Sequence, residues 1–282
     1  MPYPPANPIR LPHNQTHRIN PKRWASIVRI CNLEVVTKLS SPKSRFYFLK
    51  EKTVLVCIAF LVAFLLVAVF RSNLQSIDIA VNHWMPNIQS GNLTVFAVGI
   101  DDYFDTTYLV LYSVIIAAIF FVKHRKQMGL LLVGAMAGDA LLVSVAKRFE
   151  IVSRPDNALV QNAGYSFPSG HTAGIVVLAG VLVFFAWRYW ASRSVRVGLA
   201  GGYGTVVGVV SFDRVYLNTH WFSDVLGSLL LGAFWLLFVI LVYKWLDGLK
   251  SFQGRRFDMV ANVLYVAAAV LAVAVVVSGA VT

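Results

Sequence analysis

Long apolar runs are the feature that most constrains what this chain can fold into. Seven of them approach the roughly 17–25 residues that a helix needs to cross the hydrocarbon core of a bilayer. They lie at about 53–70, 107–122, 128–146, 172–190, 196–212, 222–243 and 259–280. Charged residues make up only 13% of the chain, against about a quarter in soluble proteins, which supports the same interpretation. We therefore expect an all-α fold, a multi-pass transmembrane helical bundle.

The run at 196–212 is the weakest of the seven candidates because it contains five glycines. In water, that glycine content would argue against a helix. In lipid, small residues let helices approach closely, and Gly204 and Gly208 have the four-residue spacing of small-residue packing motifs. We keep this run as a span on that ground.

The distribution of basic residues predicts the orientation of the bundle. Of the 25 Lys and Arg residues, twenty fall on one side: ten before the first span and ten in the segments 123–127, 188–196 and 244–256. Positive residues are retained in the cytoplasm, so the N-terminus is expected inside. The segments 71–106, 147–168 and 213–221 then face outward. The net charge of +12 is accounted for by this bias, and we expect no nucleic-acid partner.

This pattern divides the chain into three parts. Residues 1–52 form a basic cytoplasmic N-terminal segment, 53–245 a six-span membrane domain, and 246–282 a linker with an additional C-terminal transmembrane helix. Within the first part, apolar residues at helical spacing over 24–39 fit either a helix lying on the membrane surface or an ordinary cytoplasmic helix. The two cysteines, Cys31 and Cys57, offer neither a disulfide framework nor metal-ligand spacing.

Three polar stretches reach the outer face together: "KRFEIVSRP" (147–155), "FPSGH" (167–171) and "DRVYLNTHWFSD" (213–224). A lone cation at a membrane boundary is usually an anchor whose charged end reaches the interface. Here Lys147, Arg154 and Arg214 converge beside two histidines. Arginine offers a planar fork that matches phosphate oxygens, and lysine adds a point charge. The three stretches therefore indicate an anion site.

The second stretch places polar groups at the start of a helix. Pro168 is suited to a helix start, and Ser169 and Gly170 present a hydroxyl and accessible backbone N–H groups there. A helix N-terminus carries positive partial charge and binds anions. His171, in the first turn, can face the same anion. A simple serine cap would explain Ser169, but not the three cations that face it.

His220 and Asp224 are four residues apart, on one face of the next helix. A carboxylate near an imidazole fixes its tautomer and raises its basicity. A plain polar pair is the alternative, but a charged aspartate at a membrane boundary is costly unless it has a partner, so a functional role is favoured. These groups could form a phosphate-transfer site in which one histidine attacks phosphorus and the other protonates the departing oxygen. No carboxylate cluster suggests magnesium, so we expect no metal and no cofactor.

The three stretches resemble the signature motifs of the type 2 phosphatidic acid phosphatase superfamily, whose active site is shared with vanadium haloperoxidases. The match rests on Lys147 with Arg154 and Pro155, on "PSGH" at 168–171, and on Arg214 with His220 and Asp224. It covers roughly 107–243. The resemblance implies a six-helix phosphatase core and metal-independent removal of phosphate from lipid phosphates or pyrophosphates.

The resemblance also assigns individual roles. His220 becomes the nucleophile that forms phosphohistidine, Asp224 orients it, and His171 is the general acid for the leaving group. The phosphate-binding residues are Lys147, Arg154, Ser169, Gly170 and Arg214. One position departs from the family pattern: Asp213 stands where a serine usually precedes the arginine. Its carboxylate could pair with Arg214 or obstruct the phosphate.

Two other acidic features need an interpretation. Asp139 lies in the middle of a span, where an acid indicates a functional site by default. A hydrogen bond that packs helices together is the preferred explanation, with an inner role near Lys147 as the alternative. Asp101, Asp102 and Asp105 form an acidic run in the outer segment, and a solvated loop is favoured over a metal site.

The sequence thus predicts an integral lipid-phosphate or pyrophosphate phosphatase in the bacterial inner membrane, with its site facing the periplasm. Its partners are the bilayer and a lipid phosphate. Undecaprenyl pyrophosphate is the favoured substrate, with phosphatidylglycerol phosphate, phosphatidic acid and lipid A phosphates as alternatives. A lipid phosphotransferase is the closest rival. An anion transporter is a weaker one, because the span centres are apolar apart from Asp139.

Overall fold

The computed structural model describes residues 42–189 and 192–248. This part of the chain forms eight α-helices and one short 3-10 helix, and it contains no strand. The long helices are α2 (Pro42–Val69), α5 (Thr106–Val122), α6 (Lys126–Phe149), α7 (Gly170–Tyr189), α8 (Arg193–Tyr216) and α9 (Phe222–Gly248). The shorter ones are α3 (Arg71–Trp84), η1 (Met85–Asn87) and α4 (Gly91–Tyr103). The predicted all-α class is confirmed.

The number of membrane spans agrees with the sequence prediction as far as the described residues go. Five helices are long and apolar enough to cross a bilayer by themselves, namely α2, α6, α7, α8 and α9. The sixth candidate is the pair α4 and α5, which are bent by 53° at a short break. The run at 259–280 and the segment 24–39 lie outside the described residues.

Helix α7 is the centre of the bundle. It packs against α5, α6, α8 and α9, and most of its side chains are buried, whereas α2 and α8 are largely exposed. A helix that is apolar around its whole circumference is expected in the middle of a bundle. Small residues bring its neighbours close: a Cβ on Gly180 would lie 2.2 Å from the side chain of Leu236 on α9. The exposed apolar side chains of the outer helices suit contact with lipid.

The glycines of α8 do not behave as expected. A Cβ added at Gly204 or Gly208 would meet no other heavy atom within 4 Å in the described part of the chain. Helix α8 packs on the bundle through a different face, which includes Tyr203, Val207 and Val210. The small-residue spacing therefore marks a face that the described helices leave uncovered, and it does not account for the packing of α8.

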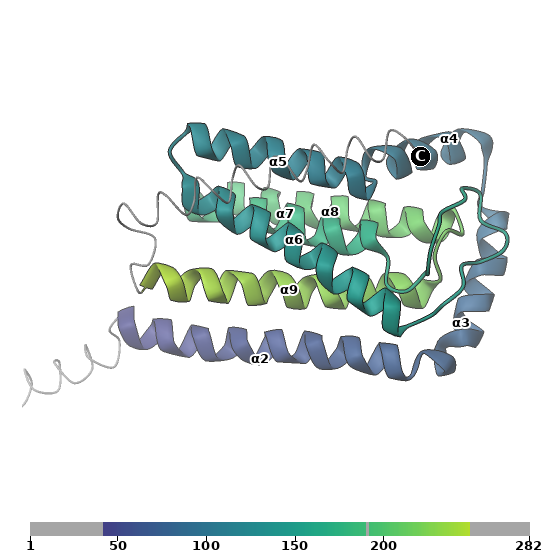
Figure 1. The fold of residues 1–282 in the computed structure, drawn as a ribbon, viewed down its shortest axis with the longest axis horizontal. Coiled ribbons are helices and arrows are strands. Elements are labelled where there is room, and N and C mark those ends of the chain that lie inside the picture. Colours follow the sequence, from purple (N-terminus) through teal and green to yellow (C-terminus); the bar gives the residue numbers. More distant parts are fainter. Residues whose placement is uncertain (1–41, 190–191, 249–282) are drawn as a thin grey trace, which may run out of the picture. The chain divides into compact units, whose positions relative to one another are not determined.

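The outer segment 71–106 is mostly helical. Helix α3 packs against α9, and α4 packs against α8. Figure 1 shows α3 at the end of the bundle where α6 ends and α9 begins. The signature motifs sit at this end, in the 150–169 loop and at the adjoining ends of α6, α7, α8 and α9. The helical outer segment supplies further side chains to the same place.

Candidate active site

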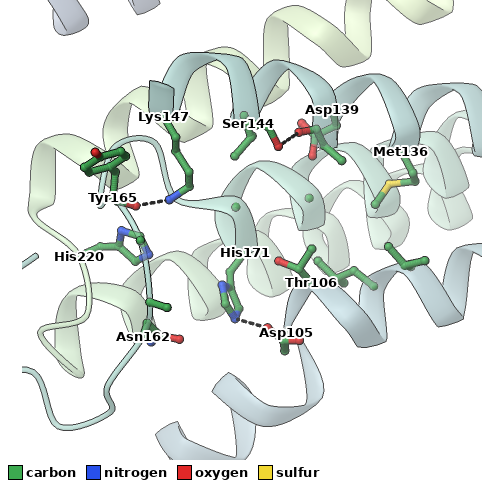
Figure 2. Close-up of a pocket in the computed structure, with 18 of the residues that line it drawn as sticks. Asp105, Thr106, Met136, Asp139, Ser144, Lys147, Asn162, Tyr165, His171 and His220 are labelled. Atoms are coloured by element: carbon green, nitrogen blue, oxygen red, sulfur yellow. Dashed lines mark hydrogen bonds and ion pairs between the residues drawn. The ribbon is translucent and has the colours of Figure 1, made fainter. Parts of the chain in front are cut away.

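Most of the predicted residues line one cavity of about 330 Å³. Five of them contribute to its wall: Lys147, Arg154, Gly170, His171 and His220. Figure 2 shows Lys147 at the end of α6, with His171 and His220 on the other side of the cavity. The remaining wall continues between α5 and α6 through apolar side chains such as Leu109, Val110 and Val143. The cavity thus joins a basic end, which carries the two imidazoles, to an apolar slot between α5 and α6.

His220 lies just before α9 and is 3% exposed. Its Nδ1 is 3.4 Å from Oδ2 of Asp224, and its Nε2 is 3.1 Å from a guanidinium nitrogen of Arg154. Because arginine can only donate, Nε2 accepts, and the ring proton is placed on Nδ1. Burial lowers the pKa of His220 to about 4, although the hydrogen bond and charge of Asp224 oppose this effect. The imidazole is therefore neutral at pH 7, with a lone pair on Nε2 beside a cation.

Asp224 is fully buried behind His220, and each of its oxygens has partners. Oδ2 accepts from the hydroxyl of Ser166 and from the backbone N–H of Trp221 at 2.9 Å. Oδ1 accepts from Arg71 at 2.8 Å, a contact between α3 and α9. These bonds hold the carboxylate in place, so that it can hold the imidazole.

A second carboxylate, Asp78 on α3, holds the first turn of α9, which carries Asp224. Its oxygens accept from the backbone N–H of Ser223 at 2.7 Å and from the hydroxyl of Ser223 at 2.6 Å. The same hydroxyl accepts from Nε of Arg71 at 3.1 Å. Acceptors at the N-terminus of a helix satisfy amides that would otherwise lack partners. Helix α3 thus fixes the start of α9, the helix that carries Asp224.

Arg154 is positioned by backbone carbonyls. Its nitrogens donate to Thr219 at 2.8 Å, to Gly164 at 3.2 Å and to Ala163 at 3.4 Å. Gly164 has a φ of 79°, a conformation that favours glycine. Burial lowers the pKa of Arg154, while the charge of Asp224 opposes that change. Arg154 remains a cation because the guanidinium group is not deprotonated in proteins, and it is held against Nε2 of the nucleophile predicted from the sequence.

Lys147 and the "PSGH" stretch complete the basic end. The ammonium of Lys147 donates to the backbone carbonyl of Tyr165 (Figure 2). Ser169 is fully buried: its hydroxyl accepts from the N–H of Thr172 at 3.5 Å, and its own N–H donates to Ser228 at 2.6 Å. Ser169 thus caps α7 and, unlike Gly170, does not line the cavity in the described structure.

Arg214 lies outside the cavity wall, although the motif predicts a phosphate contact for it. It is fully buried, and its guanidinium group is ion-paired with both Asp101 and Asp213. Its Nε has no hydrogen-bond partner in the described part of the chain. Of the two roles considered for Asp213, the structure shows the pairing with Arg214. The phosphate-binding role of Arg214 stays a prediction.

The acidic run at 101–105 does not form a solvated loop, and that expectation is wrong. Asp101 is on α4, 6% exposed, and ion-paired with Arg214. Asp105 caps α5 by accepting from the N–H of Thr107 at 2.9 Å, and it lines the cavity. Asp102 is exposed. The three acids have different surroundings because α4 directs Asp101 inward and ends before Asp105.

Asp139 lines the deep end of the cavity, on α6. It is 3% exposed, and its Oδ1 has no hydrogen-bond partner in the described residues. Oδ1 of Asp139 therefore does not make the expected helix-packing hydrogen bond within the described residues. The alternative of an inner position near Lys147 fits the structure better, since both side chains line the same cavity.

Sequence reasoning missed Arg71, Asp78, Ser166 and the two acids Asp101 and Asp105. Arg71 carried one visible signal, as one of only five cations assigned to the outer side. The acids carried another, since three aspartates cluster next to a span boundary. Ser166 and Asp78 stand in no pattern that would single them out. Their importance arises from contacts between segments far apart in the chain.

Comparisons with known proteins find a matching family and related phosphatases. The family model described as PAP2 superfamily matches residues 128–248. Phosphatidylglycerophosphatase B of Bacillus subtilis (strain 168) is 32% identical over 199 residues, which cover 70% of this chain and 97% of that protein. The putative undecaprenyl-diphosphatase YbjG of Escherichia coli (strain K12) is 37% identical over 86 residues, which cover 27% of this chain and 39% of that protein.

A solved structure shows the same fold. The crystal structure of the first transmembrane PAP2 type phosphatidylglycerolphosphate phosphatase from Bacillus subtilis superposes with a TM-score of 0.62 at 28% identity. The match covers 71% of this chain and 98% of that one. Together with the bundle of membrane helices and the three motifs at one end of it, these similarities show that the chain belongs to the PAP2 superfamily and is a membrane lipid phosphatase.

Proposed function

We propose that this phosphatase removes phosphate from a membrane lipid phosphate without a metal ion, through a phosphohistidine on His220. The observation that carries the proposal is the position of Nε2 of His220. It faces the cavity as an acceptor beside Arg154, while Nδ1 faces the buried carboxylate of Asp224. The lone pair of Nε2, which accepts from Arg154 here, thus lies beside the cations that would hold phosphate oxygens, and it becomes free to attack when Arg154 turns to the phosphate.

The reaction has two steps. In the first, Nε2 of His220 attacks phosphorus as the bond to the lipid oxygen breaks, and His171 gives a proton to that oxygen. In the second, His171 takes a proton from water, the resulting hydroxide attacks the phosphohistidine, and His220 is released with inorganic phosphate. Arg154 and Lys147 stabilise the charge on the transferring phosphoryl group. Transfer to another lipid instead of water is the phosphotransferase alternative.

For the substrate, we propose a glycerolipid phosphomonoester of the phosphatidylglycerophosphate type. The relative that this chain covers almost fully is a phosphatidylglycerophosphatase, whereas the relative named for undecaprenyl diphosphate matches over a minority of either chain. Undecaprenyl diphosphate, favoured on sequence grounds, is the second candidate. The apolar slot between α5 and α6 would hold the tail of either lipid, and apolar surfaces discriminate weakly between chains.

The test is release of phosphate from each lipid by the full-length protein in detergent, with EDTA present. Wild-type protein is expected to be active, and His220→Ala to lose at least about 10⁴-fold in kcat. His83→Ala is the matched control, because His83 is exposed and does not line the cavity. Brief incubation with ³²P-labelled lipid should label wild-type protein with an acid-labile, base-stable phosphate. Activity abolished by EDTA would contradict the metal-free mechanism, and activity surviving in His220→Ala would contradict the nucleophile.

We also propose that the site opens to the periplasm of a bacterial inner membrane, with the N-terminus in the cytoplasm. The support is the excess of basic residues in the opposite segments. Asp156→Cys and Lys123→Cys, both at exposed positions, place a thiol at each end of the bundle, in a background where Cys31 is changed to alanine. A membrane-impermeant maleimide added to intact spheroplasts is expected to label Asp156→Cys alone. Labelling of Lys123→Cys instead would invert the topology.

A further inference from the structure

Two carboxylates from the α4–α5 corner face His171. Its Nε2 is 3.4 Å from Oδ1 of Asp101 and 3.6 Å from Oδ2 of Asp105. His171 itself is 8% exposed, and Nε2 has no hydrogen-bond partner of good geometry in the described residues. Figure 2 shows the ring with Nε2 toward Asp105 and its other edge toward the side of the cavity where His220 lies.

The charges around His171 are mixed. Lys147 and Arg154 line the same cavity, and Arg214 shares Asp101 with the imidazole. Cations so close disfavour a second positive charge on the ring. The general acid in the proposed reaction must nevertheless carry a proton when the lipid oxygen departs. Among the described residues, Asp101 and Asp105 are the acids within ion-pair distance of this ring, and they oppose the effect of the cations.

We propose that Asp105, together with Asp101, is a positioning residue for the general acid His171. The carboxylates hold Nε2–H, which turns Nδ1 toward the scissile bond and favours the protonated ring. The arrangement mirrors that of His220, where Asp224 holds Nδ1 and Nε2 faces the cavity. This inference rests on the proposed function, because it assigns a partner to the acid of that mechanism.

The proton balance involves the imidazole and leaves both carboxylates ionised throughout. In the first step, the proton on Nδ1 goes to the lipid oxygen as its bond to phosphorus breaks, and Nε2–H stays with the carboxylates. In the second, Nδ1 takes a proton from the attacking water. The carboxylates orient the ring and stabilise its charge, as the aspartate does in hydrolase triads.

Asp105 is the better residue to change. Asp101 also holds Arg214, so that its removal would disturb two groups at once. Asp105 has one other duty, the cap on α5, which Asp105→Asn preserves because asparagine caps helices as well as aspartate does. Asp102→Asn is the matched control: Asp102 is three residues away, exposed, and absent from the cavity wall.

The test compares two lipids with the same acyl chains and different leaving groups. Phosphatidic acid must expel an alkoxide, which needs a proton, whereas diacylglycerol diphosphate expels a phosphate, which leaves without one. General acid catalysis typically contributes about 10²–10⁴-fold, and part of that should be lost. Asp105→Asn is expected to lower kcat about 10- to 100-fold on phosphatidic acid and less than about 3-fold on the diphosphate. Asp102→Asn should match wild type on both.

An equal loss on the two lipids, or no loss on either, would overturn the inference. The proposed function would survive both outcomes, because it depends on the effect of His220→Ala. A thermal unfolding midpoint unchanged between Asp105→Asn and wild type shows that the cap is intact. Asp105→Glu provides a second check: a longer carboxylate that restores activity on phosphatidic acid above that of the asparagine variant supports the role of the charge.

Discussion

The two histidines of this site are built in different ways. His220 receives its carboxylate from Asp224, four residues further along the same stretch of chain. His171 faces Asp101 and Asp105, which lie 70 and 66 residues earlier in the sequence, on α4 and just before α5. The first pair is buried in the bundle, whereas Asp105 is 43% exposed in its side chain. Both rings nevertheless present one nitrogen to acids and another to the cavity.

The difference shows which contacts of a site a short sequence motif can predict. Asp224 lies in the first turn of α9 and His220 just before that helix, not on its face as expected, so the pair still forms within five consecutive residues. The pairing of His171 depends on where α4 ends relative to α7, and that is decided by packing. The two pairs also differ in burial. The fully buried carboxylate of Asp224 needs a partner for its second oxygen, and Arg71 of α3 supplies it. Four predictions follow the contrast between the two pairs, in decreasing order of effect.

Asp224→Asn should have the largest effect, a fall in kcat of about 10³- to 10⁴-fold on any lipid substrate, because the amide cannot hold the Nδ1 proton of His220 as a carboxylate does. The loss should be independent of the leaving group, in contrast to that of Asp105→Asn. Steady-state kinetics on the two lipids measures both. Asp247→Asn, at the other end of α9 where the carboxylate pairs with Arg188, is the control and should leave kcat unchanged. A fall confined to phosphatidic acid would show that the two acids have the same role.

Arg71→Gln should lower kcat by about 10-fold and leave KM nearly unchanged, since Arg71 contacts Asp224 and does not line the cavity that holds the two histidines. The variant leaves a buried carboxylate without its cation, at a cost of about 2 kcal/mol in stability. A lower thermal unfolding midpoint in detergent would report that cost. Arg71→Lys should recover part of both losses. A rise in KM alone would instead indicate that Arg71 binds substrate.

The low pKa of His220 predicts how this ring responds to acid. The proposed mechanism needs a neutral imidazole at His220, and burial lowers the pKa of this ring to about 4, below the ordinary value of 6.5. The reactive form is therefore retained as pH falls from 7 to 5, and half is lost near pH 4. Histidine ring resonances of isotopically labelled protein, assigned with His220→Ala, give the titration directly. A midpoint at 6.5 or above would mean that Asp224 outweighs burial.

Asp213→Ser should have the smallest effect. It restores the usual serine of the motif and removes one of the two carboxylates that pair with Arg214, while Asp101 remains. If Arg214 contributes to phosphate binding, KM should fall by about 2- to 5-fold, or about 0.4–1 kcal/mol, with kcat unchanged. Inhibition by inorganic phosphate should strengthen by the same factor. A loss of activity would show that Asp213 is needed to hold Arg214 in place.

Much of the molecule could be predicted from local pattern. Apolar runs near 20 residues required helices that span a bilayer, since lipid offers no partner to an open backbone. The spacing of Lys147 and Arg154, of Ser169 to His171, and of His220 and Asp224 placed most of the site at helix ends on one face. These inferences succeed because membrane spans and turns of helix are short-range features that residue type controls directly.

Contacts between distant segments were decided by the tertiary structure alone. The segment 71–106 carries no long apolar run, yet α3 and α4 fold against α9 and α8, bringing Arg71 to Asp224 and Asp101 to Arg214. The direction in which Asp101 points and the burial of Arg214 depend on how helices pack, and packing sums many weak apolar contacts that no single residue reveals. The order of the spans and the pairing of His220 with Asp224 can thus be predicted from the sequence, whereas the partners of His171 are decided only in the folded bundle.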